Sequence, residues 1–470
     1  MNRGPLIVSL LCLLSGAARA EDLLAVYDRA LGNDPQLREA EATRKATLEN
    51  RPQALANLLP QLSGTASRSR TWSDGTSTST ALLGNNLFAF NSGGPSVTNN
   101  TSWALNLRQN VFSWANWTNL RAANDTVAQA EADYQVALQS FAQRVASLYF
   151  GVLAAEDFLE AQVAARDAFA RQFEQAEKRF EVGLIAITDV QEARAARDSA
   201  AASVIAAKRS LANAQEELRA TVGMPYNVLN KPADTMPLLT PAPANEEDWV
   251  KMSLDQNSAL ISSRLAADIA RDRVSNAFGG HLPTLDLVAG RTHSDSDGVQ
   301  TFITGQSGAN LANTYGKSIS LQLSVPLYSG GATQSRVRQA QYTWIAAKER
   351  LERTSRETER AARDAFQGVI SGISQVQALK QALESNQTAL KATEAGYEVG
   401  TRTAVEVLDS RRQLILAQTN YSQARYQYLN SLIGLRLASG DLDRSTIEQI
   451  NRWLTVAAPA PGPDPLPPTP

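Results

Sequence analysis

The sequence is poor in the residues that build metal, redox and catalytic centres. Among its 470 residues it has one cysteine, Cys12, and two histidines, His281 and His293. Disulfide frameworks and thiol-based metal sites need several cysteines, and the two histidines fall in different predicted elements. We therefore expect no catalytic residues, no metal site and no cofactor, and we predict that the protein is not an enzyme.

Charge of one sign and long apolar runs are also scarce. The net charge is −2 and the mean hydropathy is −0.26, which argues against a nucleic-acid partner. The apolar run Leu6–Leu14 is too short to cross a bilayer. With Arg3 before it and Ala18-Arg-Ala20 after it, residues 1–20 have the pattern of a secretory signal peptide. We predict an exported protein that is not held in a membrane by helices.

Proline is missing from two long stretches, between Ser113 and Pro225 and between Pro326 and Pro459. Alanine, the best helix former, supplies 28 of the 103 residues from Leu120 to Val222. We predict one helix from Ser113 to Phe180, about 100 Å long at about 1.5 Å per residue, and a return helix from Ile187 to Val222. Helices of this length must pack lengthwise against other helices, as in a coiled coil.

The chain contains an internal repeat. Phe180-Glu-Val-Gly-Leu-Ile-Ala-Ile-Thr-Asp-Val190 is echoed 217 residues later by Tyr397-Glu-Val-Gly-Thr-Arg-Thr-Ala-Val-Glu-Val407. In each copy a helical run reaches Val-Gly, turns and starts another helix, and glycine suits such a turn because it accepts a positive φ. A repeat of this length indicates two copies of one structural unit.

The predicted organisation follows from this repeat. It comprises a signal peptide (1–20), repeat 1 (21–224, turn at 182–184), a Pro-rich linker (225–247), repeat 2 (248–440, turn at 399–401), a short helix (441–456) and a Pro-rich disordered tail (457–470). Each repeat begins with a helical segment, 22–58 with a break at Pro35 and 249–278.

Two strands follow in each repeat, because apolar and small polar residues alternate there with a period of two. We place them at about 61–74, 99–112, 284–296 and 315–328, with polar loops at 75–98 and 297–314. Such strands fit either a half-buried sheet of a soluble domain or a transmembrane barrel with lipid outside and water inside. Four strands cannot close a barrel, and open edges are not tolerated in hydrocarbon. The membrane interpretation therefore requires several copies of the chain.

These motifs together resemble the TolC family, the outer-membrane channel-tunnels of Gram-negative bacteria. The residues that carry the resemblance are Val182-Gly-Leu184 with Ile187-Thr-Asp-Val190, Val399-Gly-Thr-Arg-Thr403 with Val407-Leu-Asp409, Leu59-Pro-Gln-Leu62, Leu282-Pro-Thr-Leu285 and Ala424-Arg-Tyr426. The resemblance covers nearly all of residues 21–454. It is closer to the non-lipidated, export-associated branch, since no cysteine is available at the mature N-terminus.

The resemblance implies a mainly α fold with a membrane β-barrel. In the family, a homotrimer forms a twelve-stranded barrel in the outer membrane, four strands per copy, which continues as a twelve-helix α-barrel across the periplasm. The implied function is a passive exit duct of a tripartite efflux pump or a type I secretion system. The implied partners are outer-membrane lipid, a periplasmic adaptor protein and an inner-membrane transporter. The alternative, a periplasmic coiled-coil adaptor or scaffold without a channel, explains the helices but not the paired strands.

Two acids are candidates for a constriction. Glu406 and Asp409 are spaced i,i+3 and share a helix face, and acids at the matching positions of the family line the narrowest ring of the periplasmic entrance. Six carboxylates in a trimer would attract cations. The family has aspartate at both positions, so the longer Glu406 puts the aperture in question. Alternatively, both acids belong to a solvated helix face and pair with Arg411 or Arg412.

The resemblance also assigns a closed gate and a docking surface. Polar links between neighbouring helices hold the closed state in the family, and the matching residues are Gln172, Thr188, Asp189, Glu394, Tyr397 and Arg402, of which Arg402 is a candidate partner of Asp189. The residues expected to contact the adaptor are Val182, Gly183 and Leu184 in the first turn and Val399, Gly400 and Thr401 in the second. Alternatively, the gate residues are ordinary surface charges. In the corresponding alternative for the docking surface, Gly183 and Gly400 serve only to close the turns, without contacting an adaptor.

Overall fold

The structure is a computed structural model that describes residues 21–83, 86–224, 226, 228–233, 235–301 and 306–457. The predicted signal peptide, nearly all of the predicted tail and three positions of the predicted linker lie outside these residues. The described chain divides into two compact units. The first contains the residues up to Arg44, Glu131–Ser262 and the chain from Glu352 on, and the second contains Lys45–Ala130 and Ser263–Leu351. Each unit takes segments from both predicted repeats.

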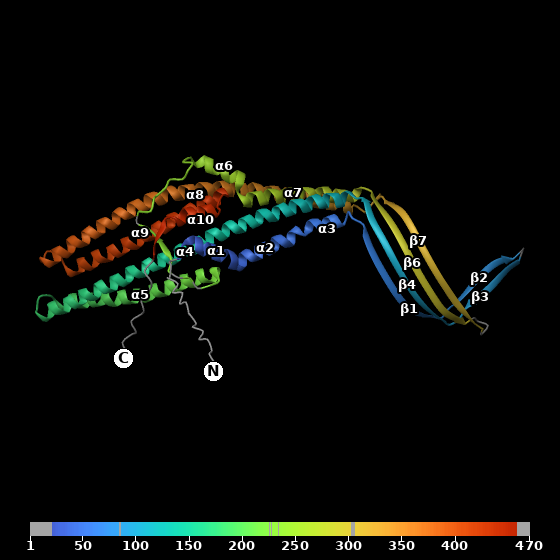
Figure 1. The fold of residues 1–470 in the computed structure, drawn as a ribbon, viewed down its shortest axis with the longest axis horizontal. Helices are drawn as coiled ribbons and strands as arrows, with labels where there is room; N and C mark the ends of the chain where they lie inside the picture. Colours follow the sequence, from blue (N-terminus) through green and yellow to red (C-terminus); the bar gives the residue numbers. More distant parts are fainter. Residues whose placement is uncertain are drawn as a thin grey trace, which may run out of the picture. The chain divides into compact units, whose positions relative to one another are not determined.

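Two helical hairpins form most of the first unit. The long helices α4 (Trp114–Glu181) and α8 (Ala332–Glu398) end here, and the return helices α5 (Ile187–Val222) and α9 (Ala404–Ser439) follow them. Figure 1 shows α4 beside α5 in green and α8 beside α9 in orange and red. The predicted helices 113–180 and 187–222 agree with α4 and α5 to within one residue at each end.

The core of the first unit lies where short helices cover these hairpins. These helices are α1 (Leu23–Asn33), the start of α2 (Pro35–Leu48), α6 (Glu246–Gln256) and α10 (Arg444–Asn451). Large side chains are fully buried there, among them Tyr149 of α4, Trp249 of α6 and Tyr428 of α9. Toward the turns the buried residues become small: Ala165, Ala196 and Ala200 lie in one cluster. Alanine there lets the helices approach closely, because its side chain ends at Cβ.

The second unit contains a four-stranded antiparallel sheet in the order β1-β4-β6-β7, visible as four neighbouring ribbons in Figure 1. The strands are β1 (Gln61–Ser73), β4 (Ser96–Phe112), β6 (Thr284–Thr301) and β7 (Ser307–Ser324). Helix α3 (Asn50–Ala56) precedes β1, and helix α7 (Ser258–Phe278) with the short turn η1 (Gly279–His281) precedes β6. Strands β1 and β7 are the edges, so each has one side without a partner strand among the described residues.

The register of the strands separates an apolar face from a polar face. Leu62 lies opposite Leu107, which lies opposite Ala289, and Leu287 lies opposite Leu321. On this apolar face large side chains are open to the surroundings: Leu62, Leu105, Ile319, Leu321 and Leu323 are exposed by 44–76 %. The other face carries Arg108 and Asn110, which both donate to Asp286 (2.9 and 3.0 Å).

Three rings lie side by side on the apolar face, on three successive strands. Trp103 of β4 lies opposite His293 of β6, which lies opposite Tyr315 of β7. The ring centroids are 6.0 Å apart in the first pair and 4.3 Å apart in the second. We call these three residues the ring row.

The prediction of polar loops at 75–98 and 297–314 was wrong. The first region forms the hairpin β2 (Thr76–Leu83) and β3 (Asn86–Gly93), and the second extends β6 to Thr301 and starts β7 at Ser307. These segments lack the apolar alternation used to identify strands. The backbone ladder stabilises a strand whatever its side chains are, and β-branched threonine favours the extended conformation.

Two predicted element ends also differ from the structure. Strand β7 ends at Ser324 and not at Tyr328, because Pro326 has no N–H for the ladder. The predicted helix 249–278 is two helices, α6 and α7, that meet at Asn257. The Asn257 side chain accepts a hydrogen bond from the Leu260 N–H at 3.1 Å and so caps α7.

The linker is tied to the first unit. Strand β5 (Asn230–Pro232) pairs with β8 (Leu454–Ala457), so the short helix predicted to continue to 456 ends earlier, at Asn451. Glu21 bridges Leu229, donating its N–H to Val228 at 2.7 Å. The Tyr149 hydroxyl donates to the Asn230 carbonyl at 2.8 Å. These pairings could not be predicted from the proline-rich composition, because they join residues distant in sequence.

Candidate functional site at the helical turns

The two turns between the long helices have the same backbone geometry. Gly183 and Gly400 have φ of +73° and +78°. These values favour glycine because a Cβ would clash with the adjacent backbone carbonyl of the chain itself. In the first turn the Gly183 and Leu184 N–H groups donate to Phe180 and Arg179, both at 2.9 Å. In the second the Gly400 and Thr401 N–H groups donate to Tyr397 at 3.2 Å and to Gly396 at 2.8 Å. Both turns are Schellman motifs, which satisfy the last carbonyls of a helix.

The turns present apolar side chains to the surroundings. Val182, Leu184 and Val399 are exposed by 69 %, 72 % and 75 %, whereas Thr401 folds back and donates its hydroxyl to the Gly396 carbonyl at 3.0 Å. No heavy atom lies within 4 Å of a Cβ built on Gly183 or Gly400. The predicted docking residues therefore form two small accessible surfaces in the chain.

Glu406 lies at the start of α9 and caps that helix. Its carboxylate accepts the Thr403 N–H at 3.1 Å while the Thr403 hydroxyl accepts the Glu406 N–H at 3.4 Å, a capping box. Arg402 lies 3.5 Å from the same carboxylate. The Arg402 side chain crosses Gly396, where a Cβ would lie only 2.7 Å from Arg402 Cγ. Within one chain Arg402 thus pairs with Glu406, not with the predicted partner Asp189.

Asp409 follows one turn later and pairs with Arg412 at 2.9 Å. The side chains of Glu406 and Asp409 remain 44 % and 60 % exposed. The Asp409–Arg412 pair is one that the alternative explanation, a solvated helix face, predicts, whereas Glu406 pairs with Arg402 of the turn. These pairs leave both carboxylates accessible, and exposed pairs are worth only about 0–1 kcal/mol each, so the single chain is compatible with both explanations.

The other predicted gate residues lie near the turns on three helices, α4, α5 and α8. Glu394 of α8 forms an ion pair with Arg411 of α9. The Arg179 guanidinium of α4 lies over the Tyr397 ring, 4.8 Å from the ring centroid. This contact joins the two hairpins. Thr188 is exposed, and Gln172 and Asp189 are half-buried. The structure therefore brings Tyr397 and Glu394 into contacts within the chain and leaves Thr188 open.

A polar cluster that the sequence analysis missed lies farther along the same helices. Asp157 of α4 is 2.5 Å from Lys231 of β5, accepts a hydrogen bond from the Tyr426 hydroxyl at 2.8 Å and accepts another from Ser422. Arg425 donates to the Pro232 and Ala233 carbonyls at 2.8 and 2.7 Å. The motif Ala424-Arg-Tyr426 was visible in the sequence, but its partners are 190 or more residues away, so no spacing revealed them.

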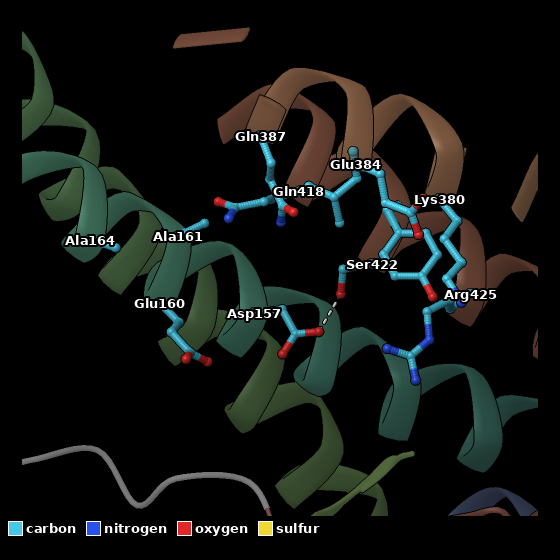
Figure 2. A pocket seen from close by; sticks show the side chains of 12 residues that line it. Asp157, Glu160, Ala161, Ala164, Lys380, Glu384, Gln387, Gln418, Ser422 and Arg425 are labelled. Carbon is cyan, nitrogen blue, oxygen red and sulfur yellow. Dashed lines mark hydrogen bonds between the residues drawn. The ribbon is translucent and has the colours of Figure 1, made fainter. Parts of the chain in front are cut away.

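Figure 2 shows the groove beside this cluster, with the Asp157–Ser422 hydrogen bond dashed. Its volume is about 510 Å³, and α4, α8 and α9 line it with both acids and bases, among them Glu160, Lys380, Glu384 and Arg425. The contacts of Asp157 with Lys231, and of Arg425 with Pro232 and Ala233, fasten the linker to α4 and α9. Among the described residues no group of three or more His, Cys, Asp or Glu side chains is placed to hold a metal ion.

The fold and the turns define a class of protein. No helix within the described part of the chain is long and apolar enough to cross a membrane. The chain combines two very long helical hairpins with a sheet whose apolar face is open. This is the protomer architecture of an outer-membrane channel.

Comparisons with known proteins identify the family. The family model described as outer membrane efflux protein matches residues 26–224 and 249–441. The chain is 36 % identical to outer membrane protein TolC of Vibrio cholerae over 459 residues, 96 % of this chain and 98 % of that protein. It is 30 % identical to the alkaline protease secretion protein AprF of Pseudomonas aeruginosa, over 94 % of this chain and 89 % of the other. The Campylobacter jejuni CmeC outer membrane channel has the same fold, with a TM-score of 0.72, 19 % identity and coverage of 93 % and 90 %.

The chain therefore belongs to the outer membrane efflux protein family, and the resemblance to TolC is confirmed. It is an exit channel for efflux or type I secretion in the Gram-negative outer membrane, and it extends into the periplasm. The alternative of an adaptor or scaffold without a channel has no support in these comparisons.

Proposed function

We propose that three copies of this chain form one duct, with their strands closed into a barrel in the outer membrane and their long helices side by side in the periplasm. The observation that carries this proposal is the sheet β1-β4-β6-β7, which has two open edges and an exposed apolar face. Open strand edges cannot persist in lipid. Pairing β1 of one copy with β7 of the next satisfies both edges and repeats around an axis.

We further propose that Glu406 and Asp409 line the constriction at the periplasmic end. Both lie within ten residues of the turn at Gly400, and both carboxylates are accessible. Three copies bring six carboxylates to one axis, where they select and bind cations. A periplasmic adaptor and an inner-membrane transporter would act on the nearby turns, at Val182, Leu184 and Val399, which are exposed and apolar.

The test is a single-channel recording in planar bilayers with and without a trivalent cation. We compare the wild type with Glu406→Gln/Asp409→Asn, which removes both charges but keeps the side-chain size, and glutamine still serves the capping box. The concentration that blocks half the current should rise about tenfold or more, since each charge pair near 4 Å is worth about 1 kcal/mol even in water.

Glu398→Gln is the matched control, because Glu398 is an exposed acid at the end of α8. It should block like the wild type. Equal block of all three proteins would reject the acidic constriction and favour the solvated helix face.

We propose that the closed state depends on the predicted links at the turns: Gln172, Thr188, Asp189, Glu394, Tyr397 and Arg402. Support comes from the contact of Tyr397 with Arg179, which joins the two hairpins, and from Arg402, whose guanidinium lies at Glu406. Arg402 is exposed, and Arg179 and Tyr397 are half-buried. Such contacts contribute about 1 kcal/mol or less each, which suits a gate that a partner must open.

Arg402→Ser or Arg179→Gln should therefore raise the conductance of the channel in the same recordings, because each removes one link between helices. Lys391→Gln, an exposed base on α8, serves as control for the loss of a positive charge. Conductance that stays at the wild-type level in both gate variants would refute this role.

A further inference from the structure

A groove of about 560 Å³ lies in the second unit, where the helices meet the sheet. Three helices line it: α4 with Trp114, α7 with Arg271, Val274 and Phe278, and α8 with Val337 and Trp344. Its wall is mostly apolar, and Arg271 is the one charged residue that lines it. A volume of this size lies within the range of about 300–1,000 Å³ typical of small-molecule sites.

The position of Trp114 in this groove is fixed by its neighbours. Its indole N–H donates to the Ser275 hydroxyl of α7 at 3.2 Å. Gly279 makes room for the ring, since a Cβ there would lie 3.2 Å from Trp114 Cδ1 and 3.0 Å from the Ala115 nitrogen. With its polar atom satisfied by the protein, Trp114 presents apolar surface to whatever fills the groove.

The groove lies at the level of a membrane interface. Leu282, which also lines it, is followed 11 residues later along β6 by His293 of the ring row. At about 3.3 Å per residue and a tilt of about 45°, this separation spans about 26 Å across the membrane, close to the roughly 25 Å of a barrel's apolar band. The ring row marks one boundary of the band, and Trp114 and Trp344 mark the other.

The groove differs from the hollow on the polar face of the sheet. That second hollow is lined by Asn57, Gln61, Arg108, Asn110 and Asp286 among others, and it shares no lining residue with the groove. Its residues belong to the face that carries the Arg108–Asp286 pair. The apolar groove is therefore separate from this polar hollow.

A neighbouring copy of the chain is the less suitable occupant. In the proposed trimer copies join at the sheet edges β1 and β7, whereas α4 and α7, which supply five of the nine lining residues, connect to the central strands β4 and β6. Helix α8, which supplies three, follows the edge strand β7. Leu282, which lines the groove, lies three residues before Leu285 of the apolar strand face, so lipid on that face would come close to the groove.

We propose that the groove binds a phospholipid of the periplasmic leaflet, with one acyl chain against Trp114, Val274 and Trp344 and the phosphate at Arg271. Arg271 suits this role because its side chain is 57 % exposed, and it is oriented by Asp268 at 3.2 Å on the same helix. A guanidinium donates two parallel hydrogen bonds to a phosphate. The site would fix the depth of the channel in the membrane.

The test uses the full chain, delipidated in detergent, and a phospholipid with brominated acyl chains, which quench tryptophan fluorescence on contact. Quenching at the groove is measured as the difference in fluorescence quenching between the wild type and the Trp114→Phe/Trp344→Phe variant. It should saturate as the lipid fraction of the micelles rises, and Val274→Phe, which fills the groove, should abolish the saturable part. Quenching that rises linearly with lipid, or that survives in Val274→Phe, overturns the site.

Arg271→Gln and Arg273→Gln separate the phosphate contact from general charge, since Arg273 is an exposed base on the same helix that does not line the groove. Half-saturation should shift about tenfold in Arg271→Gln, the loss of one charge-assisted hydrogen bond, and stay unchanged in Arg273→Gln. Brominated diacylglycerol, which has no phosphate, should bind equally to the Arg271→Gln and Arg273→Gln variants. Equal shifts in the two variants would refute the phosphate contact at Arg271.

Discussion

Glu156 is a carboxylic acid held where its charge is poorly compensated. One of its oxygens is buried and has no hydrogen-bond partner in the described chain. Burial raises its pKa from the ordinary 4.5 to about 7, Asp157 and Glu160 add to the rise, and Lys231 opposes it. Lys231 lies closer to Asp157 and Glu160, at 2.5 and 3.6 Å, and compensates them.

The stability of the protein should therefore depend on pH through Glu156. Between pH 4.5 and about 7 the unfolded chain has lost this proton while the folded chain retains it, so the free energy of unfolding falls as pH rises and levels off above about 7. Glu156→Gln should raise the free energy of unfolding at pH 8, by an amount on the order of 1 kcal/mol, and change it little at pH 4.5. Thermal unfolding in one detergent at both pH values measures this.

Glu177→Gln is the control at the residue scale, because Glu177 is an exposed acid on the same helix and does not contribute to the rise. It should leave the pH dependence in place. A pH dependence that persists unchanged in Glu156→Gln would assign the effect to another group.

At the scale of elements, the repeat is visible in the helix lengths. The long helices α4 and α8 have 68 and 67 residues, and the return helices α5 and α9 have 36 each. Both turns use a glycine with positive φ, but only the second continues into a capped helix: Thr403 caps α9, whereas Ala186 offers α5 no side-chain cap. The first turn is therefore the weaker of the two.

Gly183→Ala and Gly400→Ala should each destabilise their turn by about 1–2 kcal/mol, because a Cβ is unfavourable in the left-handed conformation. Amide hydrogen exchange of the turn should accelerate accordingly. Gly151→Ala is the matched change inside α4, where no heavy atom lies within 4 Å of the new Cβ, and it should stabilise slightly. Equal exchange in the turn variants and the wild type would contradict the strain argument.

The sequence predicted the elements that have a strong local signal. Helix α5 begins and ends where the absence of proline and the Val-Gly turn placed it, and the four strands of the sheet lie where apolar alternation indicated. The hairpin β2–β3 was missed because its apolar residues are consecutive, as in Leu87-Phe-Ala-Phe90, and do not alternate with polar residues. The contact of Asp157 with Lys231 was missed because it joins residues 74 apart that belong to no common motif. The gate residues remain predictions, because the contacts of one chain do not distinguish a closed channel from an open one.

At the scale of the whole molecule, a chain with an exposed apolar sheet face is incomplete in water. The two sheet faces allow a direct test of the membrane interpretation. Leu321 lies on the apolar face and is 63 % exposed, and Gln322 lies opposite Asp286 on the polar face. Leu321→Arg should impair membrane insertion and assembly by about 2–4 kcal/mol per copy, and Gln322→Arg should not.

Heat-resistant assembly on gels and the fraction of protein recovered in membranes provide the measurements. Both variants add the same charge at neighbouring residues of one strand, so a general effect of arginine would appear in both. Equal assembly of the two variants would show that the apolar face does not meet lipid.

The strands do not stop at the ring row. Strand β6 continues from His293 to Thr301, about 26 Å more at about 3.3 Å per residue, and β7 returns from Ser307 to Tyr315. Because the helices occupy the periplasm, this polar extension stands on the outside of the cell. We therefore expect a protease added outside the cell to reach this extension before the rest of the chain.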